Sequence, residues 1–359
     1  MTLTKRPIMQ NSNNSTAELQ NSPALIDFNA ALNKAITADL NYLFTATVPA
    51  TSNCFVLINA GQCIPNAVEQ FVSEHALEAE PLFLTMPEAE SAAIGPWLIS
   101  LPKTPTSDLI HRIVEFSVKH QAVSLFSSPF KGYALYPHLR SFMHCEFEDG
   151  STGMLRYFDP RVGFELVTNW PPELQQQFIA PFDFWSSWDR SFTPIIRLGK
   201  SLKKALAPAD QITISNDTVI HLQQSNQADL LLALNHEVRS KIEQPSPIED
   251  IAPCLQYALA VEALEFAKER QLHSQEERLS LIKNALAIHP SFYKNPRFIS
   301  ELRRLVPVGN RVEAALKNMS QNTINDWNNQ RLARLNDYYR HLTERISTRQ
   351  IHSIIKDAP

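Results

Sequence analysis

The hydrophobic pattern of this chain changes near Pro208, and the change constrains the fold more than any other feature. Before it, short apolar runs separated by Pro and Gly predict strands at residues 54–58, 82–84, 97–101 and 122–126. Beyond it, apolar residues recur every three or four positions, which predicts helices at 227–243, 255–271, 275–288 and 324–346. We therefore expect an α+β N-terminal lobe, with a mixed or antiparallel sheet and helices, followed by an all-α C-terminal lobe.

The same sequence patterns divide the chain into three segments: a tail and two domains. Residues 1–24 are rich in Asn, Ser and Gln, and their low apolar content predicts a mobile polar tail. A helix is expected at 25–44 because its apolar residues repeat with helical spacing. The boundary between the lobes falls between 190 and 225, so we expect an α+β domain at 25–205 and a helical domain at 206–359.

A hairpin is predicted within residues 141–158. Two β-compatible runs, 142–147 and 154–158, flank a turn that contains Asp149, Gly150 and Gly153. Strict alternation in the second run would place Arg156 on the same face as its apolar neighbours Met154 and Phe158. A guanidinium in that position needs an acidic partner or a route to water.

Composition limits the compartment and the partners. The chain starts with a polar stretch instead of an apolar signal, its four cysteines are scattered, and no apolar run reaches the roughly 18 residues of a spanning helix. We therefore expect a cytoplasmic protein with no membrane partner. The formal net charge is −4, yet residues 290–359 hold 12 Lys and Arg against 6 Asp and Glu. Because acids are interleaved with these cations, a solvated or protein-facing surface is favoured over a nucleic-acid site.

The usual motifs for metal, cofactor and acyl-transfer chemistry are incomplete. With only 8 Gly, the chain has no glycine-rich phosphate loop and no G-x-S-x-G turn. The zinc-protease pattern fails because Ser240 stands where a second His is needed after His236. The zinc-deaminase pattern fails because Tyr257 replaces a Cys. We expect no metal, no cofactor and no catalytic residue.

A polar cluster near the hairpin has two interpretations. It contains His138, Arg140, Arg156, Asp159 and Arg161. The cations could bind a phosphate or carboxylate while Asp159 orients His138 as a base. Alternatively, Asp159 neutralises Arg156 or Arg140 in an internal ion-pair network, and this structural interpretation is favoured.

Aromatic residues crowd the segment that follows. Trp170, Trp185 and Trp188 lie among several Phe and Pro residues. Most should pack in a core, but an exposed subset would form a partner-binding patch, since Trp is enriched at interface hot spots.

Four motifs in a fixed order carry a family resemblance. They are Asn59-Ala60-Gly61, Ile94-Gly95-Pro96-Trp97-Leu98, His138-Leu139-Arg140 and Arg156-Tyr157-Phe158-Asp159-Pro160-Arg161. Over about residues 53–190 the chain resembles the adaptor-chaperones of bacterial type VI secretion, often called Tap or Tec proteins.

The resemblance implies a non-catalytic cytoplasmic protein that binds a toxic effector and loads it onto a spike protein at the tip of the secretion tube. The copies of the family signature are Gly95, Pro96, Trp97, His138, Arg140, Arg156, Asp159, Pro160 and Arg161, and the family gives them no catalytic role. From the contrast between a domain that bears the signatures and a helical domain that carries the basic excess, we further expect the α+β domain to hold the spike, and Arg331, Arg334 and Arg345 of the helical domain to contact the effector. Two alternatives stay open: an enzyme acting on an anionic substrate through the polar cluster, and nucleic-acid binding through the basic C-terminal helices.

Overall fold

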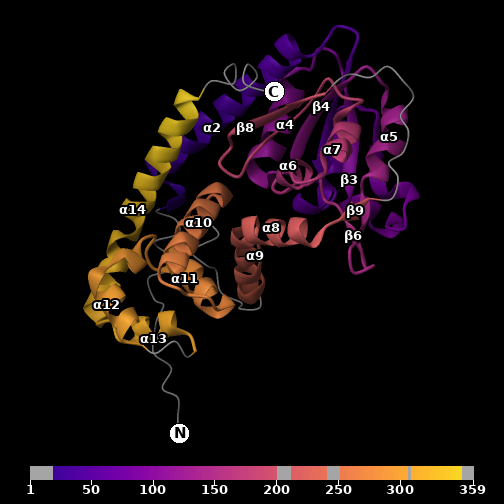
Figure 1. Cartoon of the computed structure of the whole chain (residues 1–359). Coiled ribbons are helices and arrows are strands. Elements are labelled where there is room, and N and C mark those ends of the chain that lie inside the picture. The colour runs from indigo at the N-terminus through magenta and orange to yellow at the C-terminus, as the bar shows by residue number, and fades with distance from the viewer. Residues whose placement is uncertain (1–18, 200–211, 241–250, 306–308, 350–359) are drawn as a thin grey trace. The chain divides into compact units, whose positions relative to one another are not determined.

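The chain forms two compact units (Figure 1). The computed structural model describes residues 19–199, 212–240, 251–305 and 309–349. One unit, here called the sheet unit, combines Ala31–Gln224 with Ile346–Pro359, and the other, the helical unit, combines Met1–Ala30 with Ser225–Arg345. The expected α+β and all-α lobes are both present.

The boundaries differ from those expected at residues 24 and 205. Residues 212–224 belong to the sheet unit, because Ile212 and Ile214 are buried in its core and β9 (Thr213–Ile214) pairs with one of its strands. At the N-terminus, the tail prediction for residues 1–18 lies outside the described residues. It is wrong for the residues that follow, because Leu19 is fully buried and helix α2 (Pro23–Tyr42) begins within the predicted tail.

The sheet unit is built on a six-stranded sheet of order β2-β3-β1-β4-β7-β8, in which every neighbouring pair is antiparallel. Its strands are β1 (Asn53–Asn59), β2 (Ala79–Pro81), β3 (Pro96–Leu101), β4 (Val123–Ser128), β7 (Phe184–Trp188) and β8 (Pro194–Leu198). Strand β1 is apolar along almost its whole length and is buried on both faces. An uninterrupted apolar run of this kind is typical of a central strand that is covered on both sides.

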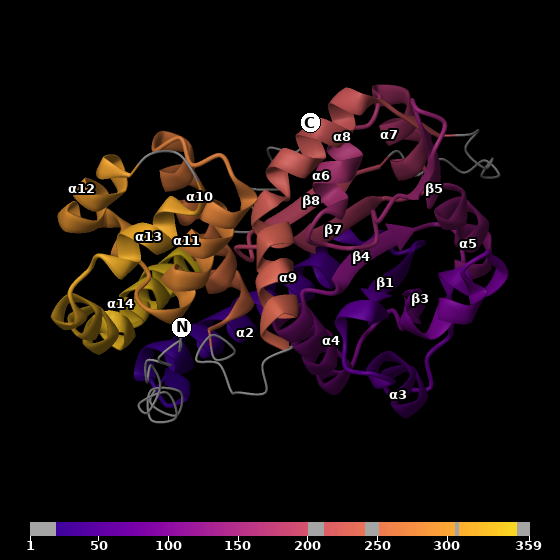
Figure 2. The ribbon, with the colours of Figure 1, turned by 90° about the horizontal axis from the view of Figure 1, so that it is seen from below.

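Helices cover both faces of this sheet. In Figure 2, α3 (Ala67–Glu74) and α4 (Ser107–His120) lie on one side, and α6 (Gly163–Thr168) and α7 (Pro172–Ile179) lie on the other. The side chains of Phe55 and Phe126 point to the second face, where they join a core that also includes residues of α5 (Gly132–Ser141). Because side chains alternate between the two faces along each strand, one sheet contributes residues to two cores.

The predicted hairpin exists, but it is shorter than expected. Strands β5 (His144–Phe147) and β6 (Thr152–Met154) pair antiparallel, and Gly150 adopts a φ of +81° in the turn. The prediction for residues 155–158 is wrong, because the strand ends at Met154 and the chain turns into the Asp159 loop. The predicted strand at 82–84 is likewise wrong, since it is the 3₁₀ helix η3 (Leu82–Thr85).

The helical unit contains the helices that the spacing predicts. They are α9 (Gln227–Ser240), α10 (Pro253–Glu269), α11 (Gln275–Ala287) and α14 (Gln321–Thr348). The unit also contains three elements that were not predicted, namely the short 3₁₀ helix η5 (Phe292–Lys294), α12 (Pro296–Arg304) and α13 (Arg311–Lys317). Helix α8 (Asn216–Ser225) precedes α9 in the chain and belongs to the sheet unit as far as Gln224. Ser274 caps the start of α11, because its hydroxyl accepts a hydrogen bond from the Glu277 amide at 3.2 Å. Glu277 is buried and pairs with Arg311 from α13 at 2.6 Å, which fixes α13 against α11.

A buried polar contact fastens the last described residue to the sheet unit. The Trp188 indole donates to Asp39 Oδ2 at 2.8 Å, and Arg349 Nη2 donates to the same oxygen at 2.5 Å. Burial raises the pKa of Asp39 above its ordinary value, and the charge of Arg349 opposes that rise. Asp39 thus anchors α2, β7 and the end of α14 within one unit.

Within the described ranges, no helix combines the length and the apolar character that crossing a membrane would require. Over the same ranges, no group of three or more His, Cys, Asp or Glu side chains is placed to hold a metal ion.

Candidate functional site

The sequence signatures converge at one end of the six-stranded sheet. Strand β1 ends where β3 begins, with Asn59 opposite Pro96, and β2 ends opposite Trp97. Strand β4 begins at the same end, with Val123 opposite Ile58. We call this the signature end. It also holds three 3₁₀ turns: η2 (Ala60–Gln62), η3 and η4 (Ala89–Ile94).

Gly95 is required by close packing. A Cβ at this position would lie 2.5 Å from the Phe83 ring, which is closer than side chains approach in proteins. Pro96 is buried and starts β3, while Trp97 is half-buried. Because Gly95 has no side chain, the Phe83 ring of η3 can pack directly against the start of β3.

Asp159 organises the last part of the signature. Its buried carboxylate accepts two hydrogen bonds from the Arg161 guanidinium at 2.7 and 2.8 Å and one from Arg156 at 3.2 Å. Its Oδ1 also accepts the Arg161 backbone N–H at 3.1 Å. Burial by itself raises the pKa of Asp159, but hydrogen bonding and charge from Arg161, with the charge of Arg156, outweigh it and hold the pKa below its ordinary value.

The two cations that Asp159 holds stay in contact with water. The Arg156 side chain is 52% exposed and the Arg161 side chain is 34% exposed. Arg156 also lies over the Phe158 ring at 5.9 Å, and that ring packs edge-on against Phe83. The Arg156–Arg161 loop is thereby joined to η3.

Arg140 has a different partner from the one expected. Its guanidinium pairs with Glu80 on β2 and donates to the Leu82 carbonyl at 2.7 Å. It therefore fixes α5 to the outer strand of the sheet. The hypothesis that Asp159 neutralises Arg140 is wrong, whereas the pairing of Asp159 with Arg156 is confirmed.

His138 lies in an aromatic environment. It is buried between Phe142, Phe178 and Phe182, and its Nε2 donates to the Phe178 carbonyl at 2.9 Å. Because a carbonyl can only accept, Nε2 carries the proton of the neutral ring. Burial lowers the pKa of His138 to about 4, and the hydrogen bond to Phe178 opposes this shift only in part.

The polar cluster therefore separates into three local arrangements. His138 bonds to a carbonyl of α7, Arg140 pairs with Glu80, and Asp159 pairs with two neighbours in its own loop. Within the described part of the chain, no hydrogen bond joins His138 to Asp159. The arrangement in which Asp159 orients a His138 base is not formed.

The three candidate tryptophans are core residues, so the hypothesis of a Trp patch is wrong. Trp170 packs edge-on against Phe178, and Trp185 stacks on Phe164 with ring centroids 3.8 Å apart. Trp188 is also buried, where its indole bonds to Asp39.

The three candidate arginines of α14 differ from one another. Arg331 is buried and donates from Nε and Nη2 to the Leu286 carbonyl, at 3.3 and 3.0 Å, which satisfies an acceptor in the last turn of α11. It is not available to a partner protein. Arg334 is half-exposed and lies over the Tyr338 ring at 5.5 Å, and Arg345 is exposed.

Sequence reasoning did not identify an exposed apolar group at the signature end. Ile64 follows η2, Leu84 lies within η3 and Ile94 ends η4, and the three residues are 66%, 54% and 63% exposed. The available signal was that each lies one to three residues before a proline (Pro65, Pro87 and Pro96), where a turn interrupts the periodicity of helices and strands.

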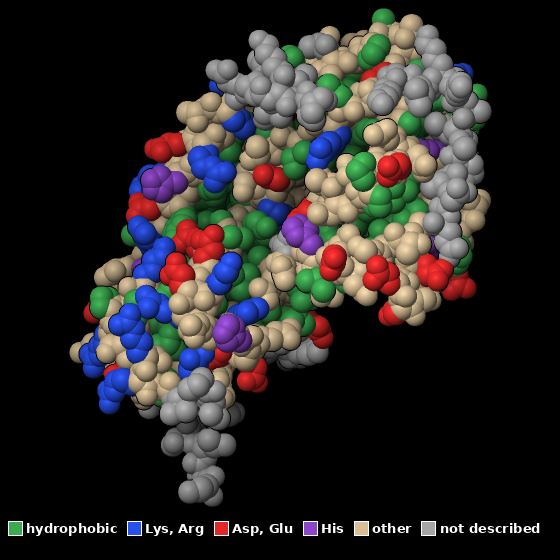
Figure 3. Space-filling view, viewed as in Figure 1, with side chains coloured by type: hydrophobic (Ala, Val, Ile, Leu, Met, Phe, Trp, Pro, Cys, Tyr) green, Lys and Arg blue, Asp and Glu red, His purple; other side chains and the backbone are tan. Residues whose placement is uncertain are grey.

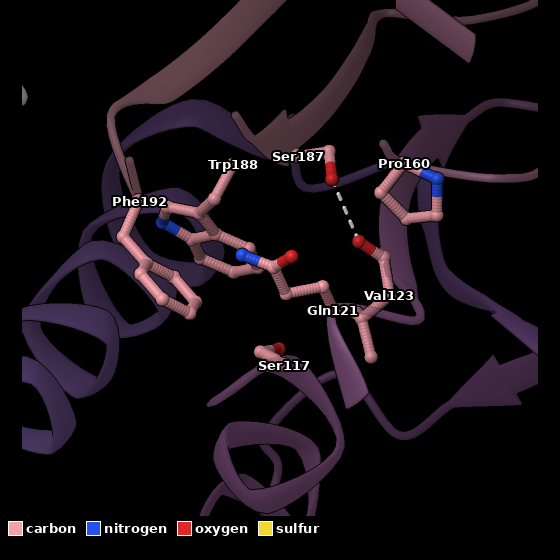
Figure 4. Close-up of a pocket in the computed structure, with 7 residues that line it drawn as sticks. All are labelled: Ser117, Gln121, Val123, Pro160, Ser187, Trp188 and Phe192. Carbon is pink, nitrogen blue, oxygen red and sulfur yellow. Dashed lines mark hydrogen bonds between the residues drawn. The ribbon is translucent and has the colours of Figure 1, made fainter. Parts of the chain in front are cut away.

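A small pocket lies beside the same end of the sheet (Figure 4). It is lined by Ser117, Gln121, Val123, Pro160, Ser187, Trp188 and Phe192. The Ser187 hydroxyl donates to the Val123 carbonyl at 2.7 Å, so this polar group is already satisfied. The pocket has room for about one water molecule and not for a metabolite.

Comparison with known proteins gives one match. Residues 54–177 match the family model described as a domain of unknown function (DUF4123), a domain known in effector adaptors of type VI secretion. The match covers about a third of the chain and contains the whole signature from Gly95 to Arg161. No curated protein and no solved structure matches the chain.

Proposed function

We propose that this protein is a non-catalytic adaptor of type VI secretion, which binds one effector in the cytoplasm and loads it onto a cognate spike protein. The observation that carries the proposal is the family match over residues 54–177, in which the signature motifs occur in their expected order. The match supports an adaptor-like role, and the proposal extends that role to two protein partners.

The chemistry of the signature end supports a binding role. The charged residues of the signature motifs are held by other groups of the chain: Asp159 by two Arg, and Arg140 by Glu80. His138 has a pKa of about 4 and is buried, so it is neutral and inaccessible at physiological pH. Arranged in this way, the residues build a rigid surface, and the adjacent pocket is too small for a substrate.

Deletion and purification in the native bacterium test the proposal. Loss of the gene should abolish delivery of one effector and leave the others secreted, because an adaptor serves only its own cargo. The tagged full chain should co-purify with that effector and with a spike protein. If neither partner is recovered and every effector is still secreted, the adaptor role is wrong.

The basic surface of the helical unit is the reason to keep nucleic-acid binding as an alternative. Figure 3 shows Lys and Arg side chains gathered over α12, α13 and α14. Several of them are paired with acids, including Arg304 with Glu301 and Arg340 with Asp337, which favours a solvated or protein-facing surface. Salt distinguishes the two: a nucleic-acid complex should weaken by about 10³-fold or more between about 50 and 200 mM salt, and a protein complex far less.

A further inference from the structure

We propose that Ile64, Leu84 and Ile94, here called the aliphatic rim, form the docking surface for one segment of a secretion partner that presents aliphatic side chains flanked by Lys or Arg. This inference rests on the proposed adaptor function and adds to it the surface and the chemistry of the partner segment. It concerns the sheet unit alone.

The rim is one surface because its three turns pack against each other. The Ala60 amide donates to the Gly95 carbonyl at 3.1 Å, and a Cβ at Gly61 would lie 2.9 Å from the Ile94 carbonyl oxygen, so η2 touches the end of η4. On the other side, the Phe83 ring of η3 packs on Gly95. Ile64, Leu84 and Ile94 are thus carried by adjoining turns at the same end of the sheet.

The turns are held rigidly, which favours a preformed binding surface. Beneath them, β1 and β3 pair without interruption from Cys54 to Asn59, and the Phe83 ring is fixed by its edge contact with Phe158. An aliphatic side chain displayed on such a support loses little conformational freedom when a partner covers it. More than half of each rim side chain faces water, so burial in an interface removes apolar surface from solvent.

The charge around the rim indicates the chemistry of its occupant. No Lys or Arg occurs between Lys34 and Lys103, a stretch that contains seven Asp and Glu residues. Among the described residues no ion pair is formed by Glu69 or Glu90, which lie within five residues of Ile64 and Ile94. The two Arg of the neighbouring loop share the single carboxylate of Asp159, so that loop is net positive and the acidic border is limited to the turns near Glu69 and Glu90. A cationic flank on the partner would complement this acidic border and speed association.

The same charge argues against other occupants. Phosphate groups of nucleic acids and anionic lipid headgroups are repelled by unpaired carboxylates. A small apolar ligand needs a concave site, whereas the rim residues stand on turns. A protein segment with an apolar face would cover the exposed aliphatic side chains, and its basic flanks would pair with the carboxylates.

Site-specific cross-linking in the native bacterium tests the surface. A photo-cross-linking amino acid is placed at position 64, 84 or 94 of the full chain, and at position 220 as the control. Ile220 is a matched control because it is 51% exposed and belongs to the same unit. The three rim positions should cross-link to one segment of the effector or of the spike that contains aliphatic residues and a net positive charge, and position 220 should not.

Substitutions then measure the contribution of the rim. With the cross-linked partner purified, Leu84→Ser together with Ile94→Ser should raise the Kd at least tenfold, whereas Ile220→Ser should change it less than twofold. Glu90→Lys should slow association severalfold and reduce its dependence on salt. All variants should keep the wild-type melting temperature, because none of these side chains is buried.

Several outcomes overturn the inference: an acidic segment, three unrelated segments, a second copy of this chain, or equal effects at positions 94 and 220. If effector and spike co-purify with the wild-type chain but the rim variants bind both normally, the surface is wrong and the adaptor function stands. If neither partner co-purifies with the wild-type chain, the adaptor function fails and the inference falls with it.

Discussion

Replacing Asp159 with Ala should destabilise the sheet unit, because this carboxylate is the shared acceptor of the Arg156–Arg161 loop. The variant removes two hydrogen bonds from the Arg161 guanidinium, one from Arg156 and one from a backbone N–H. The two guanidiniums would then face each other without the intervening negative charge. Asp159→Asn keeps an acceptor for the backbone N–H but loses the charge, so it should have a smaller effect.

The expected magnitude lies between two limits. An exposed ion pair contributes at most about 1 kcal/mol, and breaking a fully buried pair costs about 3 to 5 kcal/mol. Asp159 is buried, but its cations are 52% and 34% exposed and can turn to water when the carboxylate is lost. We therefore expect Asp159→Ala to lower the free energy of unfolding by about 2 to 3 kcal/mol.

Urea denaturation followed by Trp fluorescence is the appropriate assay. Four of the five Trp residues lie in the sheet unit, at positions 97, 170, 185 and 188, so the signal reports mainly on that unit. The exposed Glu148→Ala is the control and should change the free energy by less than about 0.5 kcal/mol. An Asp159→Ala transition that coincides with the control would refute the structural role of the loop.

The pH dependence gives an independent check. The folded-state pKa of Asp159 is below its unfolded value, so its stabilising contribution is complete above the unfolded pKa, about 3.9, and is lost as pH falls through the folded pKa. The difference between wild type and Asp159→Asn should therefore be constant from about pH 5 to 7 and shrink only in stronger acid. A difference that disappears near pH 6 would contradict this assignment.

Three further variants test other contacts. His138 is neutral in the fold with a pKa of about 4, so protonation of the unfolded chain below about pH 6.5 should destabilise the wild type by up to about 3 kcal/mol on acidification to about pH 4, and His138→Gln should remove that part of the slope in urea titrations. Gly95→Ala should lower stability by about 1 to 3 kcal/mol through its clash with Phe83, and Phe83→Leu in the same chain should restore part of the loss in thermal melts. Arg331→Met should destabilise the helical unit by about 1 to 3 kcal/mol, measured by urea denaturation followed by the helical circular dichroism signal, because it leaves a buried carbonyl without its donor.

Local patterns predicted most of the elements. Strand β1 was predictable because its apolar run is continuous, and α11 because its capping residues and its apolar spacing agree. The first strand of the hairpin and its turn followed from Gly150 and the flanking β-branched and aromatic residues. Each of these depends on interactions between residues close in sequence.

The partners of charged and aromatic residues could not be predicted in the same way. Arg140 pairs with Glu80, sixty residues earlier, because β2 lies at the edge of the sheet beside α5, and no local pattern encodes that neighbour. Arg331 lies four residues from both Trp327 and Leu335, so helical spacing places it on the buried face of α14, but no local pattern shows that the Leu286 carbonyl at the end of α11 is its acceptor. The Trp residues were assigned to two alternatives, and only the three-dimensional packing decides that all three are core.

The sequence predicted which motifs lie at the candidate site, but it did not predict which residues are exposed there. The signature motifs locate the end of the sheet correctly, but most of their side chains are buried or paired and support the turns from beneath. The exposed residues of that end are not distinguished by the sequence, since Ile64 and Leu84 belong to no motif and nothing in the Ile94–Leu98 motif indicates that Ile94 is exposed. Antiparallel pairing of β1, β2 and β3 brings them together.

The two units are each assembled from separate stretches of the chain, and this affects the order in which they can form on the ribosome. The sheet unit's Ala31–Gln224 is synthesised as one piece, so its six strands can pair before the later helices exist. The first turns of α2 must instead wait for α14, because the Ser22 hydroxyl bonds to Asn336 and Phe28 packs on Tyr339. The apolar residues of this early segment, Leu19 and Phe28 among them, are therefore uncovered during most of translation, and they are a natural substrate for general chaperones acting on the nascent chain.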